Sequence, residues 1–502
     1  MFNKIIANDE MKFNELEKKI FKFVCFIGCT LIRIFLEKYD QKLMNTRDKE
    51  KYRHKGYKIN TVKTVMGEVT YKRAIYLETI NGKTRYMFLL DETLHIAVEG
   101  KISQNLAETA LEVVVNSTSY RKAAENLNSS TNETISHEAL RNLAVSIGGK
   151  IEKREKEEIR QMKRNQLIKG TKEIPALFEE TDGLWINLQG KDRALALEKQ
   201  RHECEKKGKR FNPQARIKTE LKLHVMYEGW KANDSRHETV NKKAMAGIMK
   251  PKEIRELRDA KVYQQYDVDK IELRVTNGDG AKWTKGTTAK GGIYQKDKFH
   301  IYQEITRKVP KEYRNIIEEL FAKKEYEKIG EAIEKLKYEV YGEEQSIKKL
   351  NDLKSYLSND LERYQDVLAK QGKELPKAPE GIEYRDMGTQ ESQIFSFLKV
   401  KFCSGRKSFC VHGANTLAKV CVSVKEKEKI FEDLEKSIPI DTSVEDWIKE
   451  IESKIVKKYR NVGISNNFEN LNECKNVSLQ GAPKFLKEIF KEISFLDMQC
   501  SF

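Results

Sequence analysis

The feature that most constrains the fold is an alternating run that ends in a turn-forming acidic cluster. Residues 270–275 alternate charged with branched apolar side chains, a pattern that predicts a strand with one buried face. Asn277-Gly278-Asp279-Gly280 follows, and these residue types favour tight turns. Open α/β sheets bind their ligands at the carboxyl ends of strands. Asp279 is therefore a candidate site residue, although an ordinary turn is the commoner explanation for such a tetrapeptide on its own.

The charge balance points to a polyanionic partner. The 502 residues are 39% hydrophobic and 34% charged, with a net charge of +17. A chain of this length predicts several domains, and so basic a chain favours nucleic acid as the partner. The alternative is a basic protein whose charge serves only solubility.

The cysteines and the most apolar segment bear on location. Eight cysteines are scattered without the paired spacing of a zinc site, which predicts a reducing cytoplasm. The most apolar segment, residues 23–32, is too short to span a bilayer and lies behind an acidic lead that a signal peptide would lack. We interpret it as a buried helix and expect a cytoplasmic protein with no membrane partner.

The first part of the chain predicts a helical region and then a small sheet. Residues 1–60 are helical and end in a charged connector at 46–60, and residues 61–92 predict an antiparallel β-meander with a hairpin at Asn81-Gly82. Its outward faces interleave tyrosines with basic residues, which suits a phosphate backbone, although a solvated sheet face gives the same pattern. The basic residues are Lys63, Lys72, Arg73, Lys83 and Arg85.

Residues 93–150 predict a helical, helix-turn-helix-like region. Short helices at 119–127 and 137–147 flank a polar break, with Ser136 as the N-cap of the second and Gly148-Gly149 after it. This arrangement resembles a DNA-binding helix pair, although many helix pairs bind nothing. The candidate DNA contacts are Arg121, Lys122 and Arg141. Residues 151–172 predict a charged helical linker.

A second, strand-rich domain is expected from residue 173 to residue 300. Its first strand carries an acidic cluster that includes Asp182, a basic loop follows at 189–218, and the predicted strands are 177–188, 221–227, one within 235–245, 270–275 and 291–295. The chain then changes character three times: residues 301–380 are a charged helical insertion, residues 381–425 return to the domain with Glu391 at the head of a helix, and residues 426–502 form a charged helical tail.

Three carboxylates stand out by their context: Asp182, Asp279 and Glu391. In-line attack on a phosphodiester needs an activated oxygen, a stabilised leaving oxygen and neutralised phosphate charge, which two Mg²⁺ ions about 3.5–4 Å apart supply. Mg²⁺ prefers a few hard oxygen ligands from carboxylates. Each acid alone is more often a solvated surface charge, since the chain has 77 aspartates and glutamates.

Ordered blocks of the chain resemble the ISLre-type family of bacterial insertion-sequence transposases, which is related to the Mutator-like transposases. The resemblance covers roughly residues 5 to 425, and its blocks follow in the same order. They are residues 10–13, 63–69, 119–124 and 135–137, then Phe178-Glu179-Glu180-Thr181-Asp182-Gly183, Asn277-Gly278-Asp279-Gly280-Ala281-Lys282-Trp283, Asp297-Lys298-Phe299-His300, Met387-Gly388-Thr389-Gln390-Glu391-Ser392 and residues 413–418.

The resemblance implies a multidomain α+β or α/β protein with a ribonuclease-H-like catalytic domain. Asp182, Asp279 and Glu391 would form its DDE triad and hold two Mg²⁺ ions, with Mn²⁺ as a substitute. The protein would be a DNA transposase that hydrolyses phosphodiesters and joins strands, acting as a homo-oligomer on terminal inverted repeats and target DNA. A metal-dependent nuclease and an inactive DNA-binding protein of the same origin are the alternatives.

Several residues stay open under this resemblance. His300 is a candidate for positioning the substrate or a plain structural histidine. Trp283 could stack on a base, but a core position is favoured. Asp297 and Asp386 are rival third ligands because each lies near a proposed triad member. Ser408-Phe409 departs from the Ser-Trp pair that the family tends to show.

Overall fold

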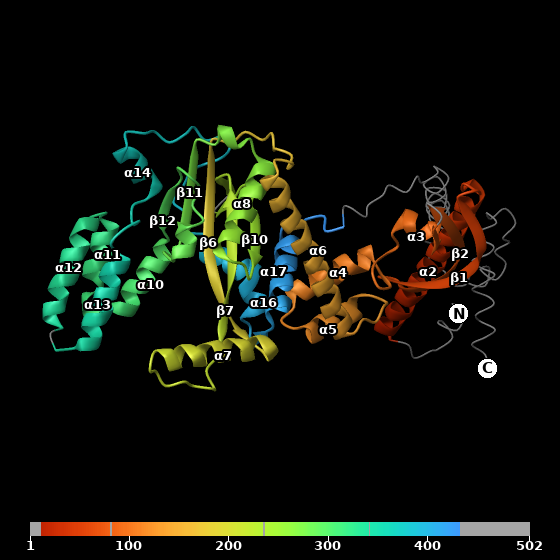
Figure 1. Ribbon diagram of the computed structural model, residues 1–502, viewed down its shortest axis with the longest axis horizontal. Coiled ribbons are helices and arrows are strands. Elements are labelled where there is room, and N and C mark those ends of the chain that lie inside the picture. The colour runs from red at the N-terminus through yellow and green to blue at the C-terminus, as the bar shows by residue number, and fades with distance from the viewer. Residues whose placement is uncertain (1–11, 81–82, 234–235, 341, 432–502) are drawn as a thin grey trace, which may run out of the picture. The chain divides into compact units, whose positions relative to one another are not determined.

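The chain forms two compact units in the computed structural model, which describes residues 12–80, 83–233, 236–340 and 342–431 (Figure 1). Of the described residues, those up to 110, 125–135 and 431 belong to the first unit, and those within 111–124 and 136–430 belong to the second. The proposed tail at 426–502 falls largely outside the described residues, as do Asn81 and Gly82 of the predicted hairpin. The structure is a mixed α and β fold with several sheets.

The first unit is a long helix packed on a small sheet. Helix α2 (Phe13–Thr46) contains the apolar segment 23–32 and lies against strand β2 (Gly67–Ile80), with Leu36, Val62 and Tyr71 in the shared core. The sheet order is β3-β2-β1-β5-β4, and the strands are β1 (Tyr52–Thr64), β3 (Lys83–Met87), β4 (Ala97–Glu99) and β5 (Ile102–Ser103). Helix α3 (Leu89–Leu94) lies between β3 and β4 in the chain order. Helices α4 (Gln104–Asn116) and α5 (Tyr120–Ser130) follow β5, and each has residues in both units.

The meander is present, but two details of it were predicted wrongly. Strand β1 begins at Tyr52, inside the expected connector, because its residues pair with β2 as far as Glu78. Arg73 does not face solvent: it is buried, forms an ion pair with Asp91 and lies with its guanidinium 3.7 Å from the centre of the Phe88 ring. A long cationic side chain can be stacked and paired inward, so alternation alone does not assign its face.

The second unit begins with a helix that is longer than predicted. Helix α6 runs from His137 to Lys163, and Ser136 caps it by accepting a hydrogen bond from the Ala139 amide. Gly148 does not end it. A β-carbon there would lie 2.3 Å from the carbonyl oxygen of Thr416 in helix α17 (Val411–Lys425), so the glycine lets two helices cross closely.

The central sheet of the second unit has the order β10-β7-β6-β11-β12. Strand β7 runs antiparallel to β6 and β10, whereas β11 and β12 run parallel to β6. Short strand β13 (Ser408–Phe409) pairs with the end of β6, and β8 (Trp230–Asn233) and β9 (Arg236–Thr239) form a separate hairpin. The other strands are β6 (Ala176–Leu188), β7 (Lys218–Tyr227), β10 (Lys243–Gly247), β11 (Leu273–Gly278) and β12 (Ile293–Lys296).

A buried charge cluster joins helix α8 (Pro251–Gln265) to one face of this sheet. Arg258 donates to both carboxylate oxygens of Glu179 at 3.0 and 3.1 Å, and Arg274 donates to one of them at 2.8 Å. Burial alone would raise the pKa of Glu179, but the two guanidinium groups hold it well below its usual value. Apolar residues around the cluster, such as Leu177, Met226 and Leu257, complete this core.

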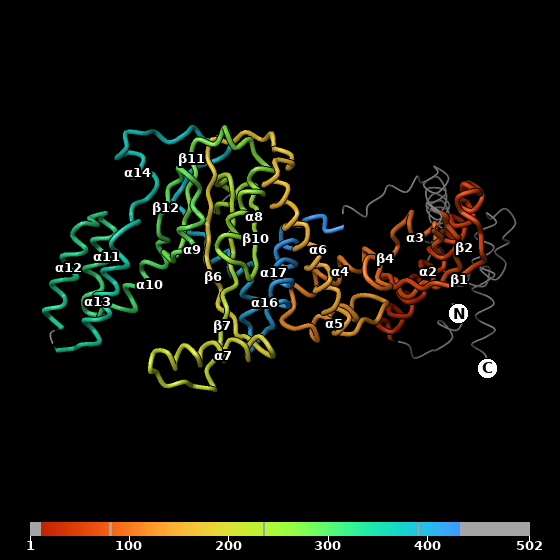
Figure 2. Tube along the Cα trace, viewed as in Figure 1, coloured from red at the N-terminus to blue at the C-terminus, as the bar shows by residue number. Residues whose placement is uncertain are grey.

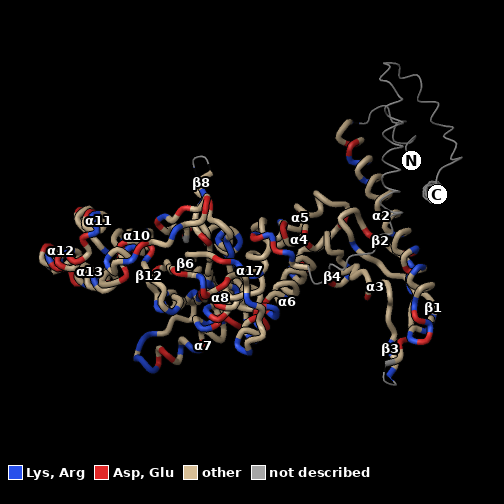
Figure 3. Tube along the Cα trace, turned by 90° about the horizontal axis from the view of Figure 1, so that it is seen from above, with Lys and Arg blue, Asp and Glu red and all other residues tan. Residues whose placement is uncertain are grey.

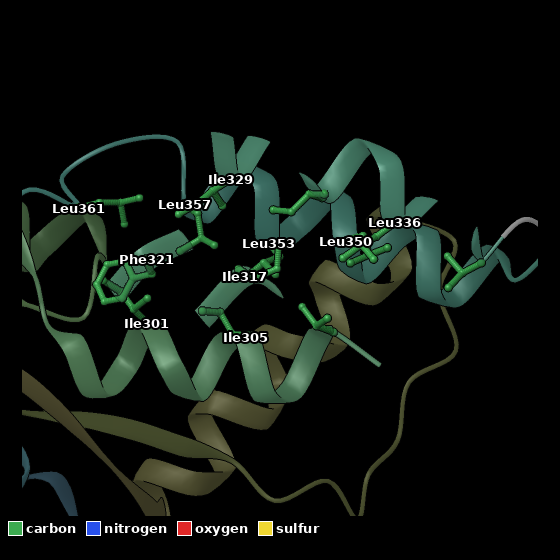
Figure 4. Close-up of a cluster of buried hydrophobic side chains, with 13 residues drawn as sticks. Ile301, Ile305, Ile317, Phe321, Ile329, Leu336, Leu350, Leu353, Leu357 and Leu361 are labelled. Carbon is green, nitrogen blue, oxygen red and sulfur yellow. The ribbon is translucent and has the colours of Figure 1, made fainter. Parts of the chain in front are cut away.

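A helical insertion follows β12 and has a core of its own. Figure 4 shows side chains from its helices directed toward one another, among them Ile305, Ile317, Leu336 and Leu353. The predicted helical character of 301–380 therefore reflects a packed bundle. The helices of the bundle are α10 (Lys298–Lys308), α11 (Arg314–Ala322), α12 (Tyr326–Glu339) and α13 (Glu344–Tyr356), whereas α14 (Tyr364–Lys370) lies against β12.

The segment 189–218 was predicted to be a basic loop, but most of it is a helix. Helix α7 (Gly190–Lys206) has no buried residue. Its lysines, arginines, glutamates, alanines and leucines are good helix formers. The apolar stripe by which a helix is usually detected in a sequence is absent, which is why the pattern suggested a loop.

Replacing Arg258 with methionine should strongly destabilise the second unit. The change leaves Glu179 buried with part of its compensating charge removed, and breaking such a pair costs about 3–5 kcal/mol. Urea unfolding followed by tryptophan fluorescence measures the loss. The matched control is Arg307→Met, because Arg307 pairs with Glu304 but its side chain is 61% exposed. Equal losses in the two variants would contradict the role given to the buried cluster.

Candidate active site

Strand β6 carries acidic side chains on both of its faces. Because strand residues alternate, Glu179 points to the α8 face while Glu180 and Asp182 point to the other face. Glu180 and Asp182 are 1% and 7% exposed. The consecutive residues Glu179 and Glu180 are both buried and cannot be solvated by water, so each face of the strand must supply hydrogen-bond partners for its carboxylates. The site described below is what faces Glu180 and Asp182.

The register between β6 and β11 places Asp279 beside Asp182. Gly278 is the partner of Thr181 in the parallel ladder, so the next residue of each strand falls in the next pair. Neighbouring strands lie about 4.8 Å apart. Strands β6 and β11 lie side by side (Figure 2). Two of the three predicted acids, separated widely in sequence, therefore come together at the end of β11.

Asp279 is held by its own turn and by the insertion. Its Oδ1 accepts hydrogen bonds from the Ala281 amide at 2.9 Å and from the Thr284 hydroxyl at 3.1 Å. Gly280 has φ +90°, a conformation that other residues rarely adopt. The Tyr356 hydroxyl, from α13, donates to the Asp279 carbonyl at 2.9 Å. The turn is thus fixed from both sides, and the carboxylate has a defined direction.

Asp297 continues the row on the next strand. Gly278 also pairs with Lys296 of β12, and the Asp297 amide donates to the Gly278 carbonyl at 2.8 Å. Its carboxylate accepts hydrogen bonds from the Asn277 side chain at 2.9 Å and from the His300 ring at 3.2 Å. Burial alone would raise the pKa of Asp297, but these hydrogen bonds hold it below the usual value.

His300 lies within the field of all three aspartates. It is in the first turn of α10, where Asp297 is also the N-cap and accepts from the His300 amide. Burial alone would lower the pKa of His300. The hydrogen bond with Asp297 and the charges of Asp182 and Asp279 raise it above the ordinary value instead.

The segment ahead of Glu391 is anchored on β6. The Thr389 hydroxyl and amide donate to Glu180 Oε1 at 2.9 and 3.2 Å, and the Tyr227 hydroxyl donates to the same oxygen at 2.5 Å. Burial, with the nearby Asp297 charge, raises the pKa of Glu180 despite these bonds. The Glu180 carboxylate thus anchors the segment around Thr389, which leads from the insertion back to Glu391.

Aromatic rings reinforce the same attachment. The Phe178 ring of β6 lies 5.5 Å from the Tyr364 ring and 5.2 Å from the Tyr384 ring, and it stacks on Tyr227 at 6.0 Å. Tyr364 and Tyr384 flank the chain that leaves the insertion and leads to Glu391. A hollow of about 730 Å³ borders this chain and is lined by Trp230, His237, Gln365, Tyr384, Arg385, Asp386, Met387, Gly388 and Thr389.

Glu391 lies in helix α15 (Gln390–Ile394), which packs against β6. The helix continues as the π-helical turn η3 (Phe395–Lys399) and then as α16 (Val400–Phe402). The wider turn brings Lys399 round to form an ion pair with the Glu391 carboxylate. π-Helical turns are rare and often occur at functional sites. Glu391 is thus near the row of acids in the fold, but its charge is engaged by Lys399.

The three predicted triad members do not form one ready-made ligand set. Among the described residues, no group of three or more histidine, cysteine or acidic side chains is arranged to hold a metal ion. Asp182 and Asp279 are neighbours, Asp297 is the next acid in the row, and Glu391 is paired with Lys399. Asp386 pairs with Lys298 at 2.5 Å and accepts a hydrogen bond from Gln365 at 3.4 Å, so its carboxylate is engaged at the border of the hollow.

Trp283 occupies a core position, as the sequence favoured. Its ring packs on the α8-side core, its Nε1 donates to Glu220 at 2.8 Å, and the Lys222 ammonium lies 4.9 Å from the ring centre. It therefore lies on the face of the sheet that Glu179 occupies, away from Asp182.

The predicted DNA contacts differ in what surrounds them. Lys72, Arg121, Lys122 and Arg141 are exposed, and Arg141 also pairs with Glu138 at 2.9 Å. Lys63 is only partly exposed and pairs with Glu133 at 2.6 Å. With Arg73 buried, the exposed members of the set remain the candidates.

The sequence did not single out the residues that tie the insertion to the site. Lys296 is buried and donates to the carbonyl oxygens of Tyr356 and Asn359, which closes the insertion onto the end of β12. Burial lowers the pKa of Lys296 to about 8. A lysine at the end of a short strand, one residue before a candidate acid, was the signal that could have indicated this contact.

The fold and the site define a mixed α and β protein whose central sheet gathers aspartates at the ends of neighbouring parallel strands. The chain belongs to the uncharacterised protein family UPF0236, whose model matches residues 6–433. A comparison with curated proteins found no match. In the part of the chain that the structure describes, no helix is long and apolar enough to cross a membrane.

We expect Asp297→Asn to lower the pKa of His300. The wild-type pKa should exceed about 6.5, the ordinary value for histidine, and the variant should fall toward or below it, because burial then acts with less opposing charge. Asparagine remains a good N-cap, so α10 should persist. Proton–nitrogen NMR of the imidazole measures both values, with His300→Gln to assign the signal and Asp386→Asn as the control carboxylate.

The sign of the stability effect follows from the same shift. Because the folded-state pKa of His300 is raised, its contribution is complete below the unfolded-state pKa and is lost as the pH rises through the folded-state value. A wild-type pKa at or below the ordinary value would contradict the electrostatic description of the site.

Proposed function

We propose that the protein is a DNA transposase that hydrolyses phosphodiester bonds at the ends of an insertion sequence and joins the freed ends to target DNA. One observation supports this above the others: Asp182 and Asp279 each follow the last paired residues, Thr181 and Gly278, of two neighbouring parallel strands, and both charges act on His300. The segment that leads to Glu391 is anchored on the same strand as Asp182. The resemblance of the same sequence blocks to ISLre-type transposases names the chemistry. Family membership alone does not supply an activity.

The sheet topology supports a ribonuclease-H-like domain as part of this proposal. In chain order, β6, β7, β10, β11 and β12 are the first to fifth strands, so the spatial order is 3-2-1-4-5 with only the second strand reversed. An acid in the first strand and an acid just after the fourth then become neighbours. The helical bundle between the fifth strand and α15 would be the insertion that the resemblance implies.

The acids fit magnesium by their chemistry, since the row supplies carboxylate oxygens that hard cations prefer. Asp182 and Asp279 would hold the ions, with Glu391 as the proposed third ligand. When bound, Mg²⁺ (or Mn²⁺) would neutralise phosphate charge and polarise the attacking water. The chain itself contributes the fixed direction of Asp279 and the anchored approach to Glu391. Lys399 would have to release Glu391. A metal cation would then replace Lys399 as the partner of Glu391, and the phosphate would become the partner of Lys399.

Asp297 competes with Glu391 for the third place. It is next to Asp279 in the strand ladder, whereas Glu391 enters from a helix. Against it stands its role as N-cap of α10 and its two side-chain hydrogen bonds, which together use much of its acceptor capacity. We therefore keep Glu391 as the proposed ligand and give Asp297, with His300, a positioning role.

Two other functions share these observations. A nuclease would use the same acids but yield cleaved DNA without joined product, and a DNA-binding protein of the same origin would not cut. The excess of basic residues suits all three. The resemblance to transposases, which usually act as assemblies on paired ends, favours a homo-oligomer and joined product.

Asp182→Asn, Asp279→Asn and Glu391→Gln should each reduce cleavage and joining of labelled element ends by at least about 100-fold, the scale on which losing one electrostatic stabiliser of a transition state acts. DNA binding should persist. Asp386→Asn is the matched control, because that carboxylate pairs with Lys298 outside the row. Full activity in all three variants would refute the assignment. Loss with Asp297→Asn but not with Glu391→Gln would transfer the third place to Asp297.

A further inference from the structure

Helix α7 extends from the end of strand β6 without packing an apolar face against the rest of the protein. It is 17 residues long, and none of them is buried. Most helices in proteins are stabilised by packing an apolar face, and α7 has none to pack: even Leu195 is 59% exposed. A helix that is polar all round needs either internal charge pairs or a partner.

The base of α7 is firmly attached while its far end is not. The Val411 amide donates to Asp192 at 2.7 Å, the Gln189 amide donates to the Phe409 carbonyl at 3.0 Å, and Arg193 reaches the carbonyl of Ala215 at 3.4 Å. Toward the far end, the described pairs are Arg201 and His202 with Glu205. The helix is thus a fixed arm with an open tip.

The charge of this arm is strongly positive. Residues 189–218 contain ten lysines and arginines against four acidic residues, a net charge of +6 out of +17 for the chain. The helical insertion, residues 301–370, has fourteen against fifteen. Lysines and arginines, drawn in blue, gather in the α7 region of Figure 3. At the tip, Lys206, Lys207, Lys209 and Arg210 are all exposed, and no ion pair within the described residues engages them.

The arm grows from the strand that carries Asp182. Leu188, at the end of β6, is six residues beyond Asp182, or about 20 Å at about 3.3 Å per residue. Helix α7 adds about 26 Å of length at 1.5 Å per residue. Duplex DNA carries a phosphate charge about every 1.7 Å along its axis, so a duplex at the acids can present phosphates to the arm several base pairs away.

We propose that α7 and the segment 207–218 bind the phosphate backbone of double-stranded DNA beside the bond to be cut. The choice of DNA as the polyanion rests on the proposed function. The contact is with the phosphates, because the tip offers lysines and one arginine on a solvated surface, and phosphate contacts of this kind carry no sequence information. Its effect is to hold the duplex in register with the acids on β6 and β11.

The test compares two fourfold variants of the full chain with the same change in charge. The arm variant replaces Lys206, Lys207, Lys209 and Arg210 with glutamine. The control replaces Lys311, Lys335, Lys348 and Lys349 with glutamine as well. These lysines are exposed on the insertion and take part in none of the described ion pairs. Fluorescence anisotropy of a labelled 40-base-pair duplex, in EDTA and over a range of salt concentrations, gives Kd and the slope of log Kd against log salt.

The arm variant should bind at least about tenfold more weakly at low salt, with the slope reduced by about 2 to 4, since each phosphate contact contributes about 0.9. The control should keep its slope within about 0.5 of the wild type. Thermal unfolding should be unchanged in both variants, because all eight replaced side chains are exposed. Equal slopes in the two variants would overturn the proposal.

The absence of divalent metal keeps this test apart from the catalytic one. If the acids proved irrelevant to cleavage, a reduced slope in the arm variant would still establish the DNA contact. If the arm variant matched the control, the contact would be refuted while the acids kept their proposed role.

Discussion

The parallel register of β11 on β6 is the constraint on which the site depends. With Gly278 opposite Thr181, the chain leaves β11 next to Asp182 and carries Asp279 there, and with Gly278 also opposite Lys296, Asp297 follows in the same row. A shift of one residue would turn each acid to the other face of its strand. The buried cluster of Glu179, Arg258 and Arg274 on the opposite face ties β6, β11 and α8 together and so opposes such a shift.

The insertion and the returning chain are both attached to the row of acids. Lys296 and Tyr356 join the insertion to the turn at Asp279, and Thr389 joins the returning chain to Glu180. Burying these polar groups is tolerable only because each is hydrogen-bonded. A helical bundle with its own core can therefore sit between β12 and α15 without separating the proposed third acid from the first two.

The acid at the end of the strand was predictable, because turn-forming residues after an alternating run mark where a strand ends. Strand β11 does end at Gly278, and Asp279 is the next residue. The start of β1, the length of α6 and the helix α7 were not. For β1 and α6 the deciding contact is with a segment distant in the sequence: β1 extends along β2, and Gly148 contacts α17 rather than ending a helix. Helix α7 has no buried apolar stripe, so its sequence lacks the period by which a helix is detected. Arg73 was misplaced because a paired guanidinium can be buried on a strand that otherwise alternates.

The central claim is that the acids gathered by this register hold divalent ions. The most direct measurement is anomalous diffraction at the manganese edge from crystals of the full chain grown with Mn²⁺ and a duplex of the element end. The account predicts manganese between the carboxylates of Asp182 and Asp279, with Glu391 released from Lys399 as a further ligand. Well-ordered carboxylates at Asp182 and Asp279 without manganese, or manganese bound only elsewhere in the protein, would contradict it.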